Sequence, residues 1–154
     1  MNVEYINPFV EASQMVLKQM TGIDARLGKI YIKTSPYGSD AIAVIIGLTG
    51  NIRGQVIFSM NKTIAFSIAS NMMGGMPINV LDELSKSAIS ELTNMILGNA
   101  ATILSNKGVS VEITPPSVFT GDNIEVYNNK MKTVCIPLIL NNDTVEIDVS
   151  IEEL

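Results

Sequence analysis

The sequence has no histidine, no tryptophan and a single cysteine among its 154 residues. The absence of histidine excludes Ser-His-Asp triads and histidine proton shuttles, and with only one cysteine it also excludes zinc sites built from Cys and His. Cys135 lies in the apolar run TVCIPLIL, which favours a buried structural thiol over a nucleophile.

Basic residues are also few: 10 Lys and Arg stand against 15 Asp and Glu, which gives a formal net charge of -5. This balance argues against nucleic acid, whose phosphates require clustered Lys and Arg. It fits an acidic protein that meets a basic patch on a partner. No apolar run approaches the ~20 residues of a membrane span, and the start MNVEYINPF lacks the basic and apolar parts of a signal peptide. We therefore expect a cytoplasmic protein with no membrane contact, folded as one domain over residues 1–154.

The first half of the chain predicts two helices with strands between them. Asn7 is the expected N-cap of the first helix, with Pro8 at its first position and Gly22 after its end. Asn61 is the expected N-cap of the second, and Gly74-Gly75 its end. The helices are predicted over residues 7–20 and 62–73, and the strands over 28–34, 40–49 and 55–60. The breaks between the strands, Ser-Pro-Tyr-Gly and Thr-Gly-Asn-Ile-Arg-Gly, are short and indicate antiparallel neighbours.

A longer helix is predicted over residues 81–105, with Asn79 as N-cap, Asp82 as its acidic partner and Gly108 after its end. Four strands follow, with a tight hairpin at Asn141-Asn142-Asp143, over residues 109–113, 119–127, 132–140 and 144–151. Together these elements predict an α+β fold, in which an antiparallel sheet packs with two long helices and one shorter helix.

The chain also shows a faint internal duplication. The segment FVEASQMVL aligns with ISELTNMIL without a gap. The alignment pairs Glu11 with Glu91, Gln14 with Asn94, and Met15 with Met95. Because strands follow each segment, we expect two helix-plus-strands halves related by a pseudo-twofold axis.

A polar stripe runs along the long helix. Its apolar residues fall on one arc and form the expected core side, namely Ile89, Leu92, Ile96, Leu97, Ala100, Ile103 and Leu104. Ser87, Glu91, Asn94 and Gly98 follow at offsets of four, three and four on the opposite side. A glycine inside a helix costs roughly 1 kcal/mol relative to alanine, so an outward Gly98 suggests that something approaches closely there. The alternative is an ordinary solvated face.

The stripe does not match the common catalytic sites. Glu91 and Asn94 are not a carboxylate pair of the glycosidase type, Gly74-Gly75 lacks the lysine and hydroxyl of a P-loop, and nothing predicts a metal site. An amide can donate and accept hydrogen bonds at once, so Asn94 could hold a water in line with a phosphoryl group. Glu91 could pair with a lysine beside that group. The stripe is therefore suited to completing the active site of a partner.

The same residues carry a family resemblance. The run MMGGMPINVLDELSKSAISELTNMILGNA, followed by VEITPPSVFTG, resembles the CheC/CheX/FliY family of bacterial chemotaxis phosphatases and is most like CheX. The family pattern of Ser or Asp, Glu four residues later, Asn three after that and a later proline corresponds to Ser87, Glu91, Asn94 and Pro115-Pro116. The resemblance extends from about Ile6 to the last strands.

The resemblance implies a phosphatase that removes the phosphoryl group from the aspartate of a CheY-type response regulator, which supplies the Mg²⁺. It implies no cofactor of the protein's own, and a homodimer. Glu91 and Asn94 would be the catalytic residues, and Ser87, Met95 and Gly98 would contact the partner. Glu11 and Gln14 would form a degenerate second site, since glutamine reaches about a methylene further than asparagine. Pro115-Pro116 is expected to shape the strand entry rather than to contact the partner.

A second hypothesis is a binding module that docks a response regulator or a flagellar-switch component without hydrolysis. Intact Glu91 and Asn94 favour the enzyme, because a scaffold would not require the amide. A small-ligand domain has little support in the sequence beyond an apolar core.

Overall fold

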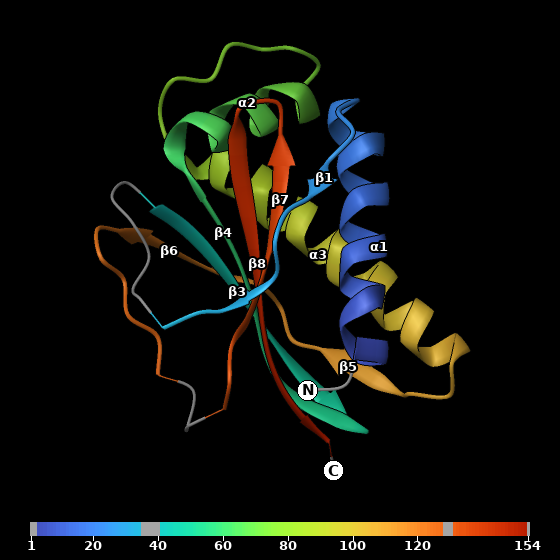
Figure 1. Ribbon diagram of the computed structural model, residues 1–154. Coiled ribbons are helices and arrows are strands. Elements are labelled where there is room, and N and C mark those ends of the chain that lie inside the picture. The colour runs from blue at the N-terminus through green and yellow to red at the C-terminus, as the bar shows by residue number, and fades with distance from the viewer. Residues whose placement is uncertain (1–2, 35–40, 128–130, 154) are drawn as a thin grey trace.

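The computed structural model describes residues 3–34, 41–127 and 131–153. Within these residues, one eight-stranded antiparallel sheet packs with three helices, which confirms the predicted α+β class (Figure 1). The long helices α1 (Val3–Thr21) and α3 (Glu83–Asn106) lie side by side against the sheet and run in opposite directions, and α2 (Lys62–Met72) lies at one end.

The centre of the sheet consists of two hairpins. They are formed by β3 (Ala41–Gly50) with β4 (Ile52–Asn61), and by β7 (Val134–Leu140) with β8 (Asp143–Glu153). The hairpins meet where β4 pairs with β8, with Val56 opposite Val149. Short strands flank both hairpins: β1 (Arg26–Leu27) and β2 (Tyr31–Ile32) pair with β7, and β5 (Val111–Ile113) and β6 (Ser117–Gly121) pair with β3.

The strand order reveals the predicted duplication. Along the sheet the order is β1-β7-β8-β4-β3-β5, with β2 also on β7 and β6 also on β3. Exchanging β4 with β8, β3 with β7, and the two flanking pairs leaves this pattern unchanged. Each half therefore consists of a long helix, a pair of short strands and a hairpin, and the short strands of each half pair with the hairpin of the other.

The pairing of short strands with the hairpin of the other half corrects one prediction. The first strand run was expected beside the next run along the chain, but Tyr31 pairs with Cys135 and Ile32 with Val134 on β7. The Ser-Pro-Tyr-Gly break lies outside the described residues. Local breaks alone could not show the pairing, because the partner strand lies about a hundred residues further along the chain.

The edge segment also departs from a continuous strand over residues 28–34. It is split into β1 and β2 opposite Pro137, which has no N–H to donate to a neighbouring strand. Gly28 passes close to the proline ring there: its N–H donates to the Pro137 carbonyl at 2.8 Å, and a Cβ on Gly28 would lie 3.1 Å from the ring.

The start of α3 is fixed by Asp82 rather than Asn79. The Asp82 carboxylate accepts from the Ser85 N–H at 2.9 Å, and the Ser85 hydroxyl accepts from the Asp82 N–H at 2.9 Å. Because of this reciprocal capping box, the helix begins at Glu83, three residues later than an Asn79 cap would place its start. The helix ends at Asn106, and Gly108 follows with φ +85°, as predicted.

The α1 helix begins at Val3, so the prediction of an Asn7 cap is wrong and Pro8 lies inside the helix. The additional turn is held by packing: Ile6 and Pro8 are buried, and the Tyr5 hydroxyl donates to the Glu153 carboxylate on β8. Gly22 follows the helix with φ +74°, as predicted.

The α2 helix and the last hairpin follow the predictions closely. The Asn61 side chain accepts from the Ile64 N–H at 3.0 Å, and Gly74 and Gly75 follow the helix with positive φ. Asn141, with φ +56°, begins the turn between β7 and β8. The strand predicted over residues 119–127, in contrast, ends at Gly121, because Asn123 turns the chain with φ +51°.

The main core lies between the helices and the inner face of the sheet. The predicted apolar arc of α3 is buried there, apart from the half-buried Ile103. This packing fixes the rotation of α3 and therefore the direction in which its polar stripe faces.

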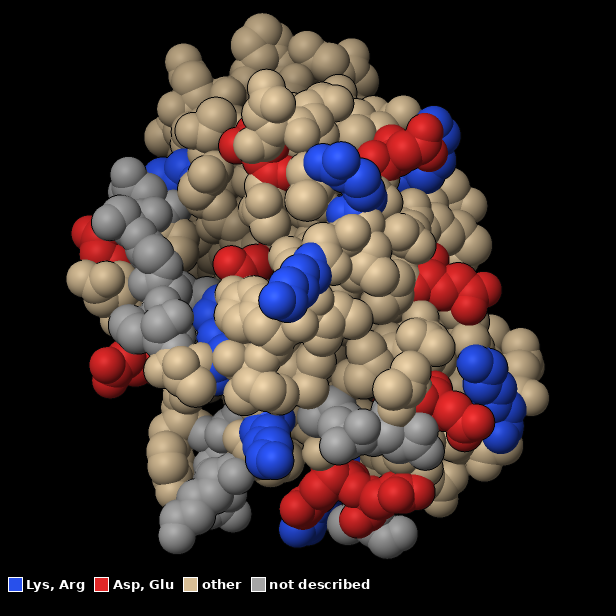
Figure 2. All heavy atoms as spheres, in the orientation of Figure 1, with Lys and Arg blue, Asp and Glu red and all other residues tan. Residues whose placement is uncertain are grey.

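The face shown in Figure 2, which includes α1, carries scattered acidic and basic groups, and the described residues on it form no continuous basic patch. None of the helices in the described ranges is long and apolar enough to cross a membrane.

Candidate functional site

The polar stripe lies on the side of α3 that faces away from the core. Ser87 and Glu91 are exposed, whereas Asn94 and Gly98 are half-buried. Their neighbours Leu92, Ile96 and Leu97 are fully buried, so the helix cannot rotate without losing core contacts.

Three stripe residues line an open hollow of about 350 Å³ between α3 and the β5–β6 segment. Ser87, Glu91 and Asn94 are on its α3 side, with Glu83, Lys86 and Ser90. Pro116 and Val118 line it from the β6 side. The hollow therefore presents hydroxyl, amide and charged groups along one wall and apolar groups along the other.

Four polar side chains of this wall have no partner among the residues that the structure describes. In residues 3–34, 41–127 and 131–153, the side chains of Ser87, Ser90, Glu91 and Asn94 make no hydrogen bond or ion pair. Other polar side chains of α3 bond to backbone carbonyls four residues earlier: Thr93 to Ile89 at 3.0 Å, Asn99 to Met95 at 2.7 Å, and Thr102 to Gly98 at 3.1 Å. The wall of the hollow thus keeps its hydrogen-bonding capacity for another molecule.

Two residues expected to contact the partner lie beside the hollow rather than in it. Met95 is half-buried and packs against the core, and Gly98 follows Asn94 by about one helical turn. Among the described residues, a Cβ on Gly98 would meet no atom within 4 Å beyond the neighbouring backbone of α3, so no packing contact there requires glycine at this position.

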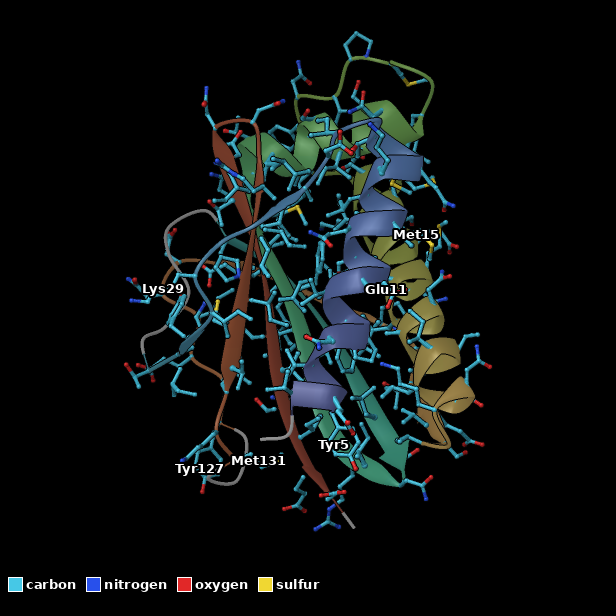
Figure 3. The ribbon with its side chains drawn as sticks, turned by 45° about the vertical axis from the view of Figure 1, so that its right-hand side comes forward. Tyr5, Glu11, Met15, Lys29, Tyr127 and Met131 are labelled. Carbon is cyan, nitrogen blue, oxygen red and sulfur yellow. The ribbon has the colours of Figure 1, made fainter. Side chains whose placement is uncertain are left out.

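The duplicate residues on α1 lie differently. Glu11 and Met15 are exposed on the flank of α1 next to α3 (Figure 3). The Gln14 side chain, however, donates a hydrogen bond to the Ala25 carbonyl at 3.1 Å. The amide that aligns with Asn94 is therefore already bonded within the protein.

Half of the residues that line the hollow were not predicted from the sequence, namely Glu83, Lys86, Ser90 and Val118. Lys86 and Ser90 belong to the flank of α3 next to the stripe, and their helical spacing with Asn94, at offsets of eight and four, was the available signal. Pro116 was expected to shape a strand entry, and it also lines the hollow. Val118 reaches the hollow because β6 pairs with β3, a long-range pairing that no local pattern encodes.

A second polar cluster lies on the outer face of the sheet. The Lys33 ammonium contacts Glu146 at 2.7 Å and Asp148 at 3.3 Å, and the Cys135 thiol and Tyr31 hydroxyl donate to the same Glu146 oxygen at 2.9 and 3.0 Å. Cys135, Glu146 and Asp148 form a group whose ligand atoms lie within 4.8 Å of one another, which the sequence did not predict. Because the Lys33 ammonium contacts both carboxylates, it already supplies the positive charge that a metal ion would bring.

The protonation states of this cluster follow from its contacts. Burial, followed by the Asp148 charge, raises the pKa of the Cys135 thiol, so the predicted structural thiol is buried and protonated. Burial raises the pKa of Glu146, but hydrogen bonds from Cys135 and Lys33 outweigh it and leave this pKa below its ordinary value. Burial lowers the pKa of Lys33, but the carboxylates of Glu146 and Asp148 raise it above its ordinary value. The cluster links the edge segment to β8 by ion pairs and hydrogen bonds.

Comparisons with known proteins identify relatives of this chain. The family described as chemotaxis phosphatase CheX matches residues 42–139. A CheY-P phosphatase CheX from Thermotoga maritima is 35% identical over 126 residues, which cover 82% of this chain and 81% of that protein. A CheC-like superfamily protein from Shewanella sp. PV-4 has a similar structure, with a TM-score of 0.89, 28% identity and coverage of 99% of each chain. A structure of the CheX-CheY-BeF3-Mg²⁺ complex from Borrelia burgdorferi matches with a TM-score of 0.82 and 29% identity over 99% of this chain and 100% of that chain.

Proposed function

Because the chain belongs to the CheX family of chemotaxis phosphatases, which act on phospho-aspartate, we propose that Asn94 orients the water that attacks the phosphoryl group of a CheY-type regulator. Glu91 anchors the regulator beside it. The observation that carries the proposal is the hollow along α3, where Glu91 and Asn94 have no hydrogen-bond or ion-pair partner in the described chain.

The amide of Asn94 suits this role because of its charge and geometry. A phosphoryl group on an aspartate is a mixed anhydride and is already reactive, so catalysis needs mainly a water held in line. A neutral amide can accept from that water and donate toward the phosphoryl oxygens without adding negative charge. Glutamine orients the attacking water of GTPases in the same manner. Alignment of this kind contributes a few kcal/mol, or about a hundredfold in rate.

Glu91 acts on the regulator rather than on the water. Its exposed carboxylate lies one turn before Asn94 and is free to pair with a lysine beside the phosphorylated aspartate. Such a pair fixes the register between the two proteins. Ser87, Met95 and Gly98 complete the contact surface around this anchor.

The remaining parts of the proposal concern metal, assembly and location. The regulator supplies Mg²⁺, in keeping with the Borrelia burgdorferi complex of CheX with CheY, BeF3 and Mg²⁺. The protein works in the cytoplasm as a homodimer, an assembly that sedimentation equilibrium at several protein concentrations would test.

The direct test of the function is phosphate release from a Mg²⁺-loaded, phosphorylated CheY-type receiver domain. Catalytic amounts of this protein should accelerate release beyond the spontaneous rate, with many turnovers per molecule. If the protein binds the phosphorylated receiver but the rate of phosphate loss stays the same or falls, with several receivers tried, the protein is a binding module.

A further inference from the structure

Lys86 is a charged residue of the hollow that the proposed mechanism does not use. Among the described residues that line the hollow, it alone is basic, and it faces the same space as Asn94. Its side chain is half-buried along the wall formed by α3. A group entering the hollow therefore meets this ammonium.

Helix stability does not explain a lysine at this position. Lys86 is the fourth residue of α3, where the partial positive charge of the helix N-terminus disfavours a cation. Glu83 lies at the i, i+3 spacing that would allow a stabilising pair. Within the described residues, however, Lys86 forms no ion pair and no side-chain hydrogen bond.

The charges around the hollow indicate what the lysine does. Glu83 and Glu91 also line the hollow, and alone they would repel an anionic group. A phosphorylated aspartate is anionic, and a positive charge on this side of the interface attracts it in addition to the Mg²⁺ and the lysine that the regulator supplies. We propose that Lys86 is a positioning residue that attracts the phosphorylated site of the regulator and guides it into the hollow. This inference rests on the proposed phosphatase function.

The expected effect is on encounter and affinity rather than on the chemical step. A charge at the rim of an interface changes the association rate and its salt dependence. Removing it should raise KM about threefold to tenfold at low ionic strength and leave kcat within about twofold. The effect should disappear near 1 M salt, where the screening length falls to about 3 Å.

The test compares Lys86→Gln with Lys107→Gln in the phosphate-release assay at low and high salt. Lys107 is the exposed C-cap residue of α3, so its substitution removes the same charge from the same helix at the opposite end. Lys86→Gln should show the salt-dependent rise in KM, Lys86→Glu a larger rise, and Lys86→Arg should retain native kinetics. Lys107→Gln should behave as the native protein.

The outcomes separate two failures. If the native protein accelerates phosphate release but Lys86→Gln and Lys107→Gln have the same KM at low salt, the role of Lys86 is wrong and the function stands. A fall in kcat without a change in KM would also overturn the positioning role. If the native protein does not accelerate release from any receiver, the proposed function fails, and the role of Lys86 fails with it. Urea unfolding of each variant checks that the fold is intact.

Discussion

The side-chain amide of Gln14 donates a hydrogen bond to the carbonyl oxygen of Ala25 at 3.1 Å. This bond joins α1 to the segment that leads into β1. Its counterpart in the duplicated half, Asn94, has no such bond in the described chain. The two halves thus use aligned amides for different purposes, one structural and one available to a partner.

Gln14→Ala should therefore reduce stability and not activity. Loss of one partly buried hydrogen bond should lower the free energy of unfolding by about 1 kcal/mol. The measurement is urea unfolding together with the phosphate-release assay. A Gln14→Ala variant that lost phosphatase activity without a loss of stability would show that α1 carries a working second site.

The features that were predicted from the sequence are those encoded locally. The 3.6-residue periodicity gave the buried face of α3 and hence its polar stripe, and Asn61, Gly22 and Gly108 marked helix ends as expected. The start of α1 was missed because packing of Ile6 and Pro8 outweighs the usual preference for proline at the first turn.

The features that were not predicted depend on long-range pairing. The exchange of short strands between halves joins β2 to β7 and β6 to β3. The pairing of β6 with β3 places Pro116 and Val118 opposite α3. Only because of this pairing does the polar stripe become one side of a hollow. The contacts of Lys33 with Glu146 and Asp148 arise in the same way, from the pairing of β2 with β7.

Gly98→Ala should have opposite effects on stability and on binding. A Cβ there would meet no described atom within 4 Å beyond the neighbouring backbone of α3, and alanine in a helix interior is favoured over glycine by up to ~1 kcal/mol. The added methyl group should obstruct the close approach of the regulator and raise its Kd. Isothermal titration with a BeF3-loaded receiver measures the binding.

Ser105→Ala is the matched control for Gly98. It also raises helix propensity, but at an exposed position near the end of α3. It should leave the Kd unchanged. Equal affinity of the Gly98→Ala and native proteins would remove Gly98 from the contact surface.

Stability should fall in acid through Glu146. Its pKa in the folded protein is below the ordinary 4.5, so its contribution is present above pH 4.5 and is lost as the pH falls through the lower, folded value. Urea midpoints measured between about pH 6 and pH 3 should therefore decline less steeply in Glu146→Gln than in the native protein. Parallel declines would contradict the assignment.

Lys33→Met should be strongly destabilising at neutral pH. It leaves the fully buried Asp148 and the partly buried Glu146 without the ammonium that contacts both. Breaking a buried pair in this way costs roughly 3 kcal/mol. The control is Lys29→Met, because Lys29 is exposed and lies in the same edge segment, just before β2. This substitution should be close to neutral. If Lys33→Met left the free energy of unfolding nearly unchanged, the ion pairs of this cluster would not stabilise the fold.

The most direct test of the central claim is the rate of phosphate release at saturating phosphorylated receiver, for Asn94→Ala and Glu91→Ala beside the native protein. Both residues lie on the outer side of α3 and lack intramolecular side-chain bonds in the described chain, so both variants should remain folded. Asn94→Ala should lose about a hundredfold in the saturating rate with little change in Kd, and Glu91→Ala should chiefly raise Kd. An Asn94→Ala variant that retained the native saturating rate would contradict the assignment of Asn94 to the attacking water.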